Sequence, residues 1–243
     1  MISVCIATYN GALFIKQQLI SILSQLQKDD EVIISDDGST DKTLEIIESL
    51  NDNRIRIFHH KHKKNPFYKK STVASVTYNF ENALYACHGR VIFLSDQDDV
   101  WYPNKVKICL KALENNDAVL SNFSIINEKD NVTVERYMEK CPFSKNNVYN
   151  ILKPPFLGCC LAFNRNVLDK ALPFPEKICI HDLWLGLVAN KIGKVAYIGE
   201  PLIFHRFWSN NTSNYGKKSP NSLFVKLKYR FWNFYELSKV LKT

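Results

Sequence analysis

Short apolar runs alternate with stretches of helical periodicity over the first part of the chain. Each run is rich in β-branched residues and is bounded by polar turn residues, which is typical of a buried strand. Between the runs, apolar positions recur every three or four residues and predict helices. The predicted strands cover residues 2–7, 31–35, 55–58 and 91–94, and the predicted helices cover residues 13–26, 41–50 and 71–87. This alternation predicts an α/β fold with a Rossmann-like, mostly parallel sheet and helices on both faces.

The pattern changes after residue 117, where two strands follow one another across a polar turn. Such strands predict antiparallel additions to the parallel sheet. Later strands are predicted over residues 118–126, 132–137 and 195–198 and near residue 163, and later helices over 166–172 and from about residues 103 and 182. From residue 222 on, large apolar residues lie along one helical stripe with Lys and Arg around them. We therefore predict an α/β domain over residues 1–216 and a basic amphipathic helix over residues 217–243.

Polar side chains follow three of the predicted strands at the point where each strand ends. They are Thr8, Tyr9 and Asn10 after the first strand, Asp36 and Asp37 after the second, and Asp96, Asp98 and Asp99 after the fourth. Ligands of parallel α/β sheets bind outside the carboxyl ends of the strands, so these groups are expected to form one site. Taken singly, each acidic group can also be a turn or a helix cap, and Tyr9 can be a core aromatic.

The acidic cluster indicates a metal ion. Asp96, Asp98 and Asp99 lie within four positions, and a bound cation best offsets their mutual repulsion. Carboxylate oxygens suit a hard divalent ion, so Mn²⁺ or Mg²⁺ is expected. If the ligand is a nucleotide diphosphate, the cation bridges two phosphates, and Asp36 or Asp37 accepts from the base or the ribose.

Composition is that of a globular protein, with 46% hydrophobic and 23% charged residues. Seven cysteines without a C-x-x-C pair favour free thiols in a reducing cytoplasm. Met1 leads directly into a strand pattern, so no targeting peptide is expected. No apolar run approaches the roughly 20 residues that cross a bilayer. A cytoplasmic protein, soluble or peripheral at a membrane, is predicted.

The net charge of +8 is unevenly placed. Residues 217–243 hold seven Lys or Arg and one Glu, and so carry six of the eight net charges. A basic helix rich in aromatic residues suits an anionic membrane surface. Packing of this helix on its own domain or on a partner subunit is the alternative. A second basic patch lies at residues 59–70. No nucleic-acid-binding motif is present, so nucleic acid is not an expected partner.

Three stretches, in this order and spacing, are similar to glycosyltransferase family 2. They are residues 3–11, 33–41 and 93–101, the last of which reads Phe-Leu-Ser-Asp-Gln-Asp-Asp-Val-Trp. This form resembles the bacterial polysaccharide and O-antigen branch, with rhamnosyl-, glucosyl- and galactosyltransferase-like members. The resemblance implies a GT-A fold, a UDP- or dTDP-sugar donor, a divalent metal and inversion at the anomeric carbon. Related enzymes often extend a saccharide on a polyprenyl diphosphate, so a lipid-linked acceptor is expected.

Single residues of this chain match motif positions of the family, and the resemblance implies a role for each of them. Asp96-Gln97-Asp98 matches the family's D-x-D motif, which implies that Asp98 binds the metal directly and that Asp96 contacts the ribose or the metal. Asp99 is open between a site role and a helix cap. Asn79 and Asn82 also match family positions, with surface and capping roles as alternatives.

A second motif, His181-Asp182-x-Trp184, resembles the family's catalytic position. On that resemblance Asp182 is the general base that deprotonates the acceptor hydroxyl. A carboxylate that caps the following helix is the alternative for Asp182. His181 is the alternative base, because its unperturbed pKa suits neutral pH.

A later segment departs from the family's Y-R-Q-H-x-x-N-like run. Arg206 and Asn211 match it, but Phe207 and Trp208 stand where relatives have Gln and His. That His is a candidate metal or diphosphate contact in relatives, and His205 replaces it only if the strand register differs. Arg206 is then the expected diphosphate partner, by its charge and fork geometry.

The sequence thus predicts an inverting, metal-dependent glycosyltransferase of surface-polysaccharide synthesis at the inner face of a bacterial plasma membrane. A nucleotidyltransferase that forms nucleotide-sugars is one alternative, but it usually needs a basic Gly-rich loop, and residues 6–14 contain neither Lys nor Arg. An inactive scaffold of a polysaccharide-assembly complex is the other, and only the change at Phe207-Trp208 favours it.

Overall fold

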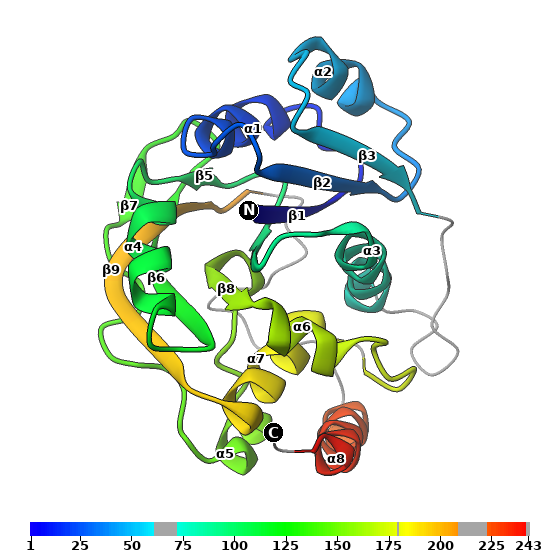
Figure 1. Ribbon diagram of the computed structural model, residues 1–243, viewed down its shortest axis with the longest axis vertical. Coiled ribbons are helices and arrows are strands. Elements are labelled where there is room, and N and C mark those ends of the chain that lie inside the picture. The colour runs from blue at the N-terminus through cyan, green and yellow to red at the C-terminus, as the bar shows by residue number, and fades with distance from the viewer. Residues whose placement is uncertain (61–71, 179, 209–222, 242–243) are drawn as a thin grey trace.

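The computed structural model describes residues 1–60, 72–178, 180–208 and 223–241 (Figure 1). Nine strands in these ranges form one sheet. They are β1 (Ile2–Thr8), β2 (Glu31–Asp36), β3 (Ile55–His59), β4 (Val91–Ser95), β5 (Val100–Trp101), β6 (Ala118–Ile126), β7 (Val132–Val134), β8 (Leu161–Asn164) and β9 (Val195–Arg206). Neighbouring strands follow the order β3-β2-β1-β4-β8-β6-β9-β5, and β7 pairs with β6.

The half of the sheet formed by β3, β2, β1 and β4 is parallel throughout. Figure 1 shows α1 (Ile15–Leu23) and α2 (Thr43–Ser49) on one face of this half and α3 (Thr72–Ala86) on the other. Because helices cover both faces, every residue of β2 is buried, and the strands read as continuous apolar runs. The predicted α/β fold is confirmed, and the predicted elements of this half agree with the structure to within three residues.

The other half mixes strand directions. β8 runs antiparallel to β4 and β6, β9 runs parallel to β6, and β5 runs antiparallel to β9. The antiparallel additions are therefore present, whereas β5 was not predicted, because two residues are too few to show a periodicity. The remaining helices are α4 (Lys105–Leu113), α5 (Asn147–Leu152), the 3₁₀ turn η1 (Gly158–Cys160), α6 (Arg165–Ala171), α7 (His181–Ile192) and α8 (Leu223–Lys239).

Helix α8 is the predicted basic amphipathic helix, and it contacts α5 and α7 at the end of the molecule remote from β3 (Figure 1). The predicted domain boundary at 216/217 and most of the basic patch at 59–70 lie outside the described residues, so the boundary stays a prediction. Within the described ranges, no helix combines the length and the hydropathy needed to cross a bilayer.

Candidate functional site

Strand register brings three polar strand ends to one edge of the sheet. Thr8 lies opposite Asp36, and Ile6 lies opposite Ser95, the last residue of β4. Because these strands run parallel, the loops that follow them leave the sheet side by side. The expected convergence of the three strand ends is therefore present in the structure.

Gln97 joins the end of β1 to the end of β4. Its Oε1 accepts from Thr8 Oγ1 at 2.6 Å and from the Tyr9 N–H at 3.0 Å, and its Nε2 donates to the Tyr9 carbonyl at 3.1 Å. A Cβ at Gly11 would come within 2.4 Å of the same Oε1, so this close approach requires glycine. The sequence assigns Gln97 no role beyond its place between two aspartates, and only the fold reveals this bridge.

The side chain of Tyr9 is 55% exposed, so the alternative of a core aromatic is wrong. Its ring is accessible to a nucleobase at the carboxyl edge of the sheet. Asn10 has a φ of 48°, a left-handed conformation that Asn tolerates better than most residues. Its N–H donates to Ser39 Oγ at 2.9 Å, and its Oδ1 accepts from the Thr40 N–H at 2.8 Å. Asn10 therefore holds the β1 and β2 loops together.

Asp36 and Asp37 have different surroundings. Asp36 is 1% exposed, and its own turn uses both of its oxygens, through the N–H groups of Gly38 and Ser39 at 3.1 and 2.9 Å and through Ser39 Oγ at 2.5 Å. The alternative that Asp36 is a turn residue therefore agrees best with its contacts. Asp37 Oδ1 instead lies 2.8 Å from His60 Nδ1, which orients this carboxylate at the edge of the sheet. Asp37 is the better candidate for a base or ribose contact.

Two asparagines of α3 donate hydrogen bonds to the carboxyl ends of β1 and β2. Asn79 Nδ2 donates to the Thr8 carbonyl at 3.2 Å, and Asn82 Nδ2 donates to Ser35 Oγ at 2.8 Å. Asn79 is 3% exposed, which excludes the surface role for this residue. Both side chains position the loops that carry the candidate site.

Asp99 and His205 form a buried ion pair behind the acidic cluster. His205 Nδ1 lies 2.8 Å from Asp99 Oδ1, and the two side chains are 2% and 0% exposed. Burial lowers the pKa of His205, but the charge and the hydrogen bond of Asp99, together with the charges of Asp96 and Asp98, outweigh burial and raise this pKa to about 9. The Arg206 N–H donates to the same oxygen at 3.1 Å. Asp99 therefore anchors β9 to the cluster, and the helix-cap reading of Asp99 is wrong.

Among the described residues, no Lys, Arg or His side chain forms an ion pair with the carboxylate of Asp96 or Asp98. Burial, followed by the charges of neighbouring aspartates, raises the pKa of Asp96 to about 8, and burial and Asp99 raise that of Asp98 to about 6. Asp98 Oδ2 accepts a hydrogen bond from Trp208 Nε1 at 2.7 Å. Carboxylates that are held together at this electrostatic cost fit a divalent cation.

Four possible metal-ligand atoms, one each from Asp96, Asp99, Cys159 and His205, lie within 4.8 Å of one another. A hydrogen bond with Cys160 and burial raise the pKa of Cys159, so it is a thiol, and His205 is paired with Asp99. The second oxygen of Asp99 is buried without a hydrogen-bond partner among the described residues, which a cation or its water would satisfy. A hard ion fits here, with Asp96 and Asp99 as the oxygen ligands of this group, of which Asp98 is not a member.

Arg206 is not placed to bind a diphosphate, contrary to the prediction from the sequence. Its side chain is 0% exposed and lies over the Phe14 ring, 4.3 Å from the centroid. Protein groups occupy the guanidinium, namely the carbonyls of Asp98 and Asn127 at 2.9 and 3.1 Å, Gln17 Oε1 at 2.9 Å and Asp130 Oδ1 at 2.6 Å. Continued from the Val100–Phe204 pair, the antiparallel register of β5 and β9 places Arg206 opposite Asp98. Arg206 therefore supports the backbone of the acidic cluster.

Asp182 lies in the first turn of α7. Its Oδ1 accepts from the Leu183 N–H at 2.7 Å, and its Oδ2 accepts from the Gly158 N–H at 3.1 Å. The first bond lies within the first turn of α7, whose N-cap residue is Ile180, and the second ties the carboxylate to η1, which packs against β4. The charge of Asp182 also contributes to the raised pKa of Asp96, so the two carboxylates share one region.

His181 is stacked on Phe80 with 4.1 Å between the ring centroids, and it is 7% exposed. Burial lowers its pKa, and Asp182 opposes this only in part. A buried neutral ring that an acceptor cannot reach is a poor general base, so the geometry favours Asp182 over His181.

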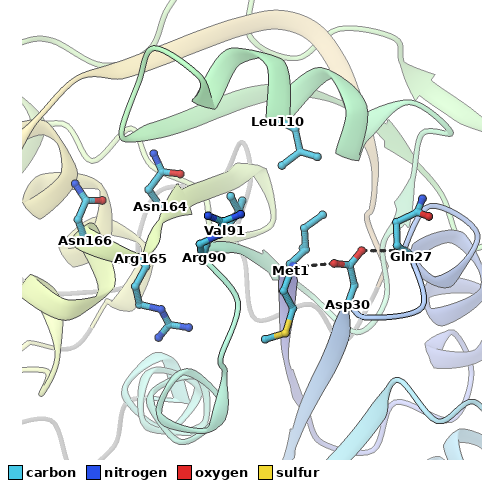
Figure 2. Close-up of a pocket in the computed structure, with 10 residues that line it drawn as sticks. Met1, Gln27, Asp30, Arg90, Val91, Leu110, Asn164, Arg165 and Asn166 are labelled. Carbon is cyan, nitrogen blue, oxygen red and sulfur yellow. Dashed lines mark hydrogen bonds between the residues drawn. The ribbon is translucent and has the colours of Figure 1, made fainter.

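A cavity of about 730 Å³ opens at the opposite edge of the sheet, where β1 and β4 begin (Figure 2). In Figure 2, Asp30 lies between Met1 and Gln27, and Arg90 and Arg165 come from the other side. Its lining includes none of the predicted site residues. The nucleotide site expected at the carboxyl edge is therefore distinct from this cavity.

We expect Gln97→Ala to weaken donor binding about tenfold, because the loss of three hydrogen bonds releases the β1 loop. Calorimetric titration with UDP or dTDP checks this. Gln27→Ala, at the far cavity, is the matched control and should leave the nucleotide affinity unchanged. Equal affinities for both variants would show that the bridge has no role in binding.

A parallel half-sheet whose polar strand ends converge, with an acidic cluster at the same edge, is an arrangement typical of nucleotide-binding α/β proteins. Residues 3–172 match the sequence model of the family described as Glycosyl transferase family 2, and the chain belongs to this family. S. aureus TarS 1-349 in complex with UDP-GlcNAc has a similar fold, with a TM-score of 0.69 at 18% identity over 96% of this chain and 66% of that one. The predicted GT-A fold is thereby confirmed.

Three relatives in sequence are named as glycosyltransferases. An uncharacterized glycosyltransferase of Rickettsia felis is 31% identical over 80% of this chain, which spans only 31% of that protein's length. The dTDP-rhamnosyl transferase RfbG of Shigella flexneri is 29% identical over 84% of this chain and 72% of its own. The Escherichia coli UDP-Glc:alpha-D-GlcNAc-diphosphoundecaprenol beta-1,3-glucosyltransferase WfgD is 27% identical over 78% of this chain and 70% of its own.

Proposed function

We propose that the chain transfers a sugar from a UDP- or dTDP-sugar to a saccharide hydroxyl with inversion at the anomeric carbon. The observation that carries this proposal is that a helix-borne carboxylate, Asp182, lies in the same region as the acidic cluster of β4. The names of RfbG and WfgD support these two nucleotides. Membership of family 2 disfavours the nucleotidyltransferase alternative.

The nucleotide is held by the loops after β1 and β2. Tyr9 lines the base, Asp37 accepts from the base or ribose, and Asn10 and Asp36 keep the two loops in place. Thr8 acts through the Gln97 bridge. A base with N–H groups, such as uracil or thymine, is complementary to a carboxylate acceptor.

Asp98 and Asp96 are the proposed ligands of a divalent ion, Mn²⁺ or Mg²⁺. When bound, this ion would offset the negative charge that develops on the departing diphosphate. The protein contributes the placement of these two carboxylates, since Arg206 and Trp208 fix Asp98 through its carbonyl and its Oδ2. Their raised pKa values support the proposal of a positive charge at this place.

Asp182 is the proposed general base. It takes the proton of the acceptor hydroxyl while that oxygen forms a bond to the anomeric carbon, and the bond from this carbon to the diphosphate oxygen breaks on the opposite face. The Gly158 and Leu183 N–H groups each donate to one oxygen of Asp182 and orient the carboxylate, and each oxygen keeps a second lone pair that can take the proton. One displacement of this kind inverts the configuration.

We propose a saccharide on a polyprenyl diphosphate as the acceptor, at the cytoplasmic face of a bacterial membrane. The name of WfgD, which includes a diphosphoundecaprenol acceptor, supports this class. A donor screen tests the whole proposal: UDP- and dTDP-sugars are offered with a short-chain diphosphate-linked saccharide, and nucleotide release and glycosylated product are both measured. Product from one donor is expected, and the absence of product with all donors would favour the inactive scaffold.

Substitutions at Trp208 test whether Asp98 binds the metal, and they require no measurement of turnover. Its Nε1–H can donate to Asp98 but cannot bind a metal, so it occupies an oxygen that a cation would otherwise share. We expect Trp208→His to raise Mn²⁺ affinity about tenfold, because it adds a nitrogen ligand beside Asp98. Trp208→Phe removes only the donor and is the control. Calorimetric titration with Mn²⁺ measures both, and equal affinity in both variants would place the ion away from Asp98.

A further inference from the structure

Helix α8 presents its large apolar side chains outward. Of its residues, Asn233 is 0% exposed and Leu237 is 6% exposed, and these two face the protein. The outward stripe is apolar and lies at helical spacing. It consists of Leu223 (70% exposed), Phe224 (76%), Leu227 (55%), Phe231 (59%), Phe234 (56%) and Tyr235 (44%), and Leu241 (76%) follows the helix. The alternative that this stripe packs on its own domain is therefore wrong.

The apolar surface continues onto α5, which contacts α8. Val148, Tyr149 and Leu152 of α5 are 48%, 45% and 50% exposed. Arg230 links the two helices by donating to the Leu152 carbonyl at 2.8 Å. A contiguous patch of this kind marks an interaction surface. We call these residues of α5 and α8, together with Leu241, the α5–α8 surface.

Polar contacts hold α8 in this orientation. Lys191 Nζ donates to the Leu237 carbonyl at 2.6 Å, near the end of the helix. Lys177 Nζ lies 3.5 Å from the centroid of the Trp232 ring. Tyr229 packs with Ile180 against Ala74 of α3. Lys177 and Ile180 belong to the segment that leads into Asp182, so α8 packs against this segment.

The positive charge around the α5–α8 surface favours an anionic bilayer over a second copy of the chain as its binding partner. Residues 217–243 carry seven Lys or Arg and one Glu, and that Glu236 is paired with Lys239 at 2.7 Å. Lys153 adds a cation at the end of α5. Two copies of this surface would bring like charges together, whereas an anionic bilayer offers an apolar interior and opposite charge.

We infer that the α5–α8 surface docks flat on an anionic phospholipid bilayer, with its apolar side chains in the interface and its Lys and Arg at the headgroups. This deepens the proposed function and rests on it for the lipid-linked acceptor, because it places the bilayer next to the segment that carries Asp182. The bilayer contact itself requires no turnover.

The test is co-sedimentation of the full chain with phosphatidylcholine vesicles that contain or lack phosphatidylglycerol. We expect binding to the anionic vesicles, weakened by salt, and a loss of at least about tenfold in Leu227→Gln/Phe231→Gln. Both positions are exposed, so the variant should fold as the parent does, which circular dichroism checks. Tyr85→Gln, at a position 60% exposed on α3, is the matched control and should bind like the parent.

Two results would overturn the inference, and two further measurements separate it from the proposed function. Equal vesicle binding by the double variant and the parent would overturn the inference. So would a dimer of the parent, measured by light scattering without vesicles, that the double variant converts to a monomer, because the surface then covers a second copy. Asp182→Asn should still bind vesicles, and the double variant should still release nucleotide with a water-soluble acceptor, so failure of the docking surface and failure of the proposed function are separable.

Discussion

Asp182→Asn is expected to lower the rate of sugar transfer by about 10³-fold, because the amide cannot take the proton of the acceptor hydroxyl. The amide keeps the size of the carboxylate, and its oxygen can still accept from the Gly158 or the Leu183 N–H, so the start of α7 should stay folded. Nucleotide-sugar binding should therefore remain close to that of the parent chain. Product formation and calorimetric titration with the donor measure the two quantities separately.

Asp169→Asn is the matched control, because Asp169 is an exposed carboxylate of the neighbouring helix α6. This variant should transfer sugar at the parent rate. If Asp182→Asn weakened donor binding and left turnover intact, Asp182 would be a capping residue only, and the base would have to be sought elsewhere.

Asp98→Ala is expected to abolish metal-stimulated turnover, with a loss of about 10²–10³-fold. The substitution removes an oxygen ligand and also deprives the indole N–H of Trp208 of its acceptor. The Arg206 contact is to the backbone carbonyl of residue 98, so the fold of the β5–β9 region should persist. Transfer rates at increasing Mn²⁺, with direct titration of Mn²⁺ binding, provide the measurement.

Asp29→Ala is the control for Asp98→Ala, because Asp29 is an exposed aspartate outside the candidate site. The parent chain should lose turnover when a chelator is added and regain it with Mn²⁺. Parent turnover that persists in the presence of chelator would remove the metal from the mechanism, whatever Asp98→Ala does.

The parallel half of the fold follows from the sequence alone. Hydrophobic periodicity depends on local geometry, with period 2 or a buried run for strands and 3.6 for helices, so the elements of this half are predictable from their own residues. Parallel strands then send their carboxyl ends to one edge, which is why Thr8, Asp36 and the β4 acids meet there. The motifs at these ends predicted the family, which is confirmed.

The roles within the site depend on contacts between residues far apart in the chain. The two-residue strand β5 pairs with β9, and the register of this pairing places His205 opposite Asp99 and Arg206 opposite Asp98. No local pattern shows a strand so short, and so the sequence predicted Arg206 at the diphosphate. Gln97 likewise reaches Tyr9 only after β1 and β4 have paired.

The orientation of α8 was also undetermined by the sequence. Its periodicity showed one apolar stripe, but a stripe can face the protein or the surroundings with the same spacing. The polar contacts of Lys191 and Arg230 with carbonyl groups and the buried Asn233 turn the stripe outward. The sequence by itself determined the elements of the parallel half, the convergence of its polar strand ends and the family, because these depend on local order and chain direction. Only the tertiary structure decided which charges are paired and which faces are covered, because those depend on long-range packing.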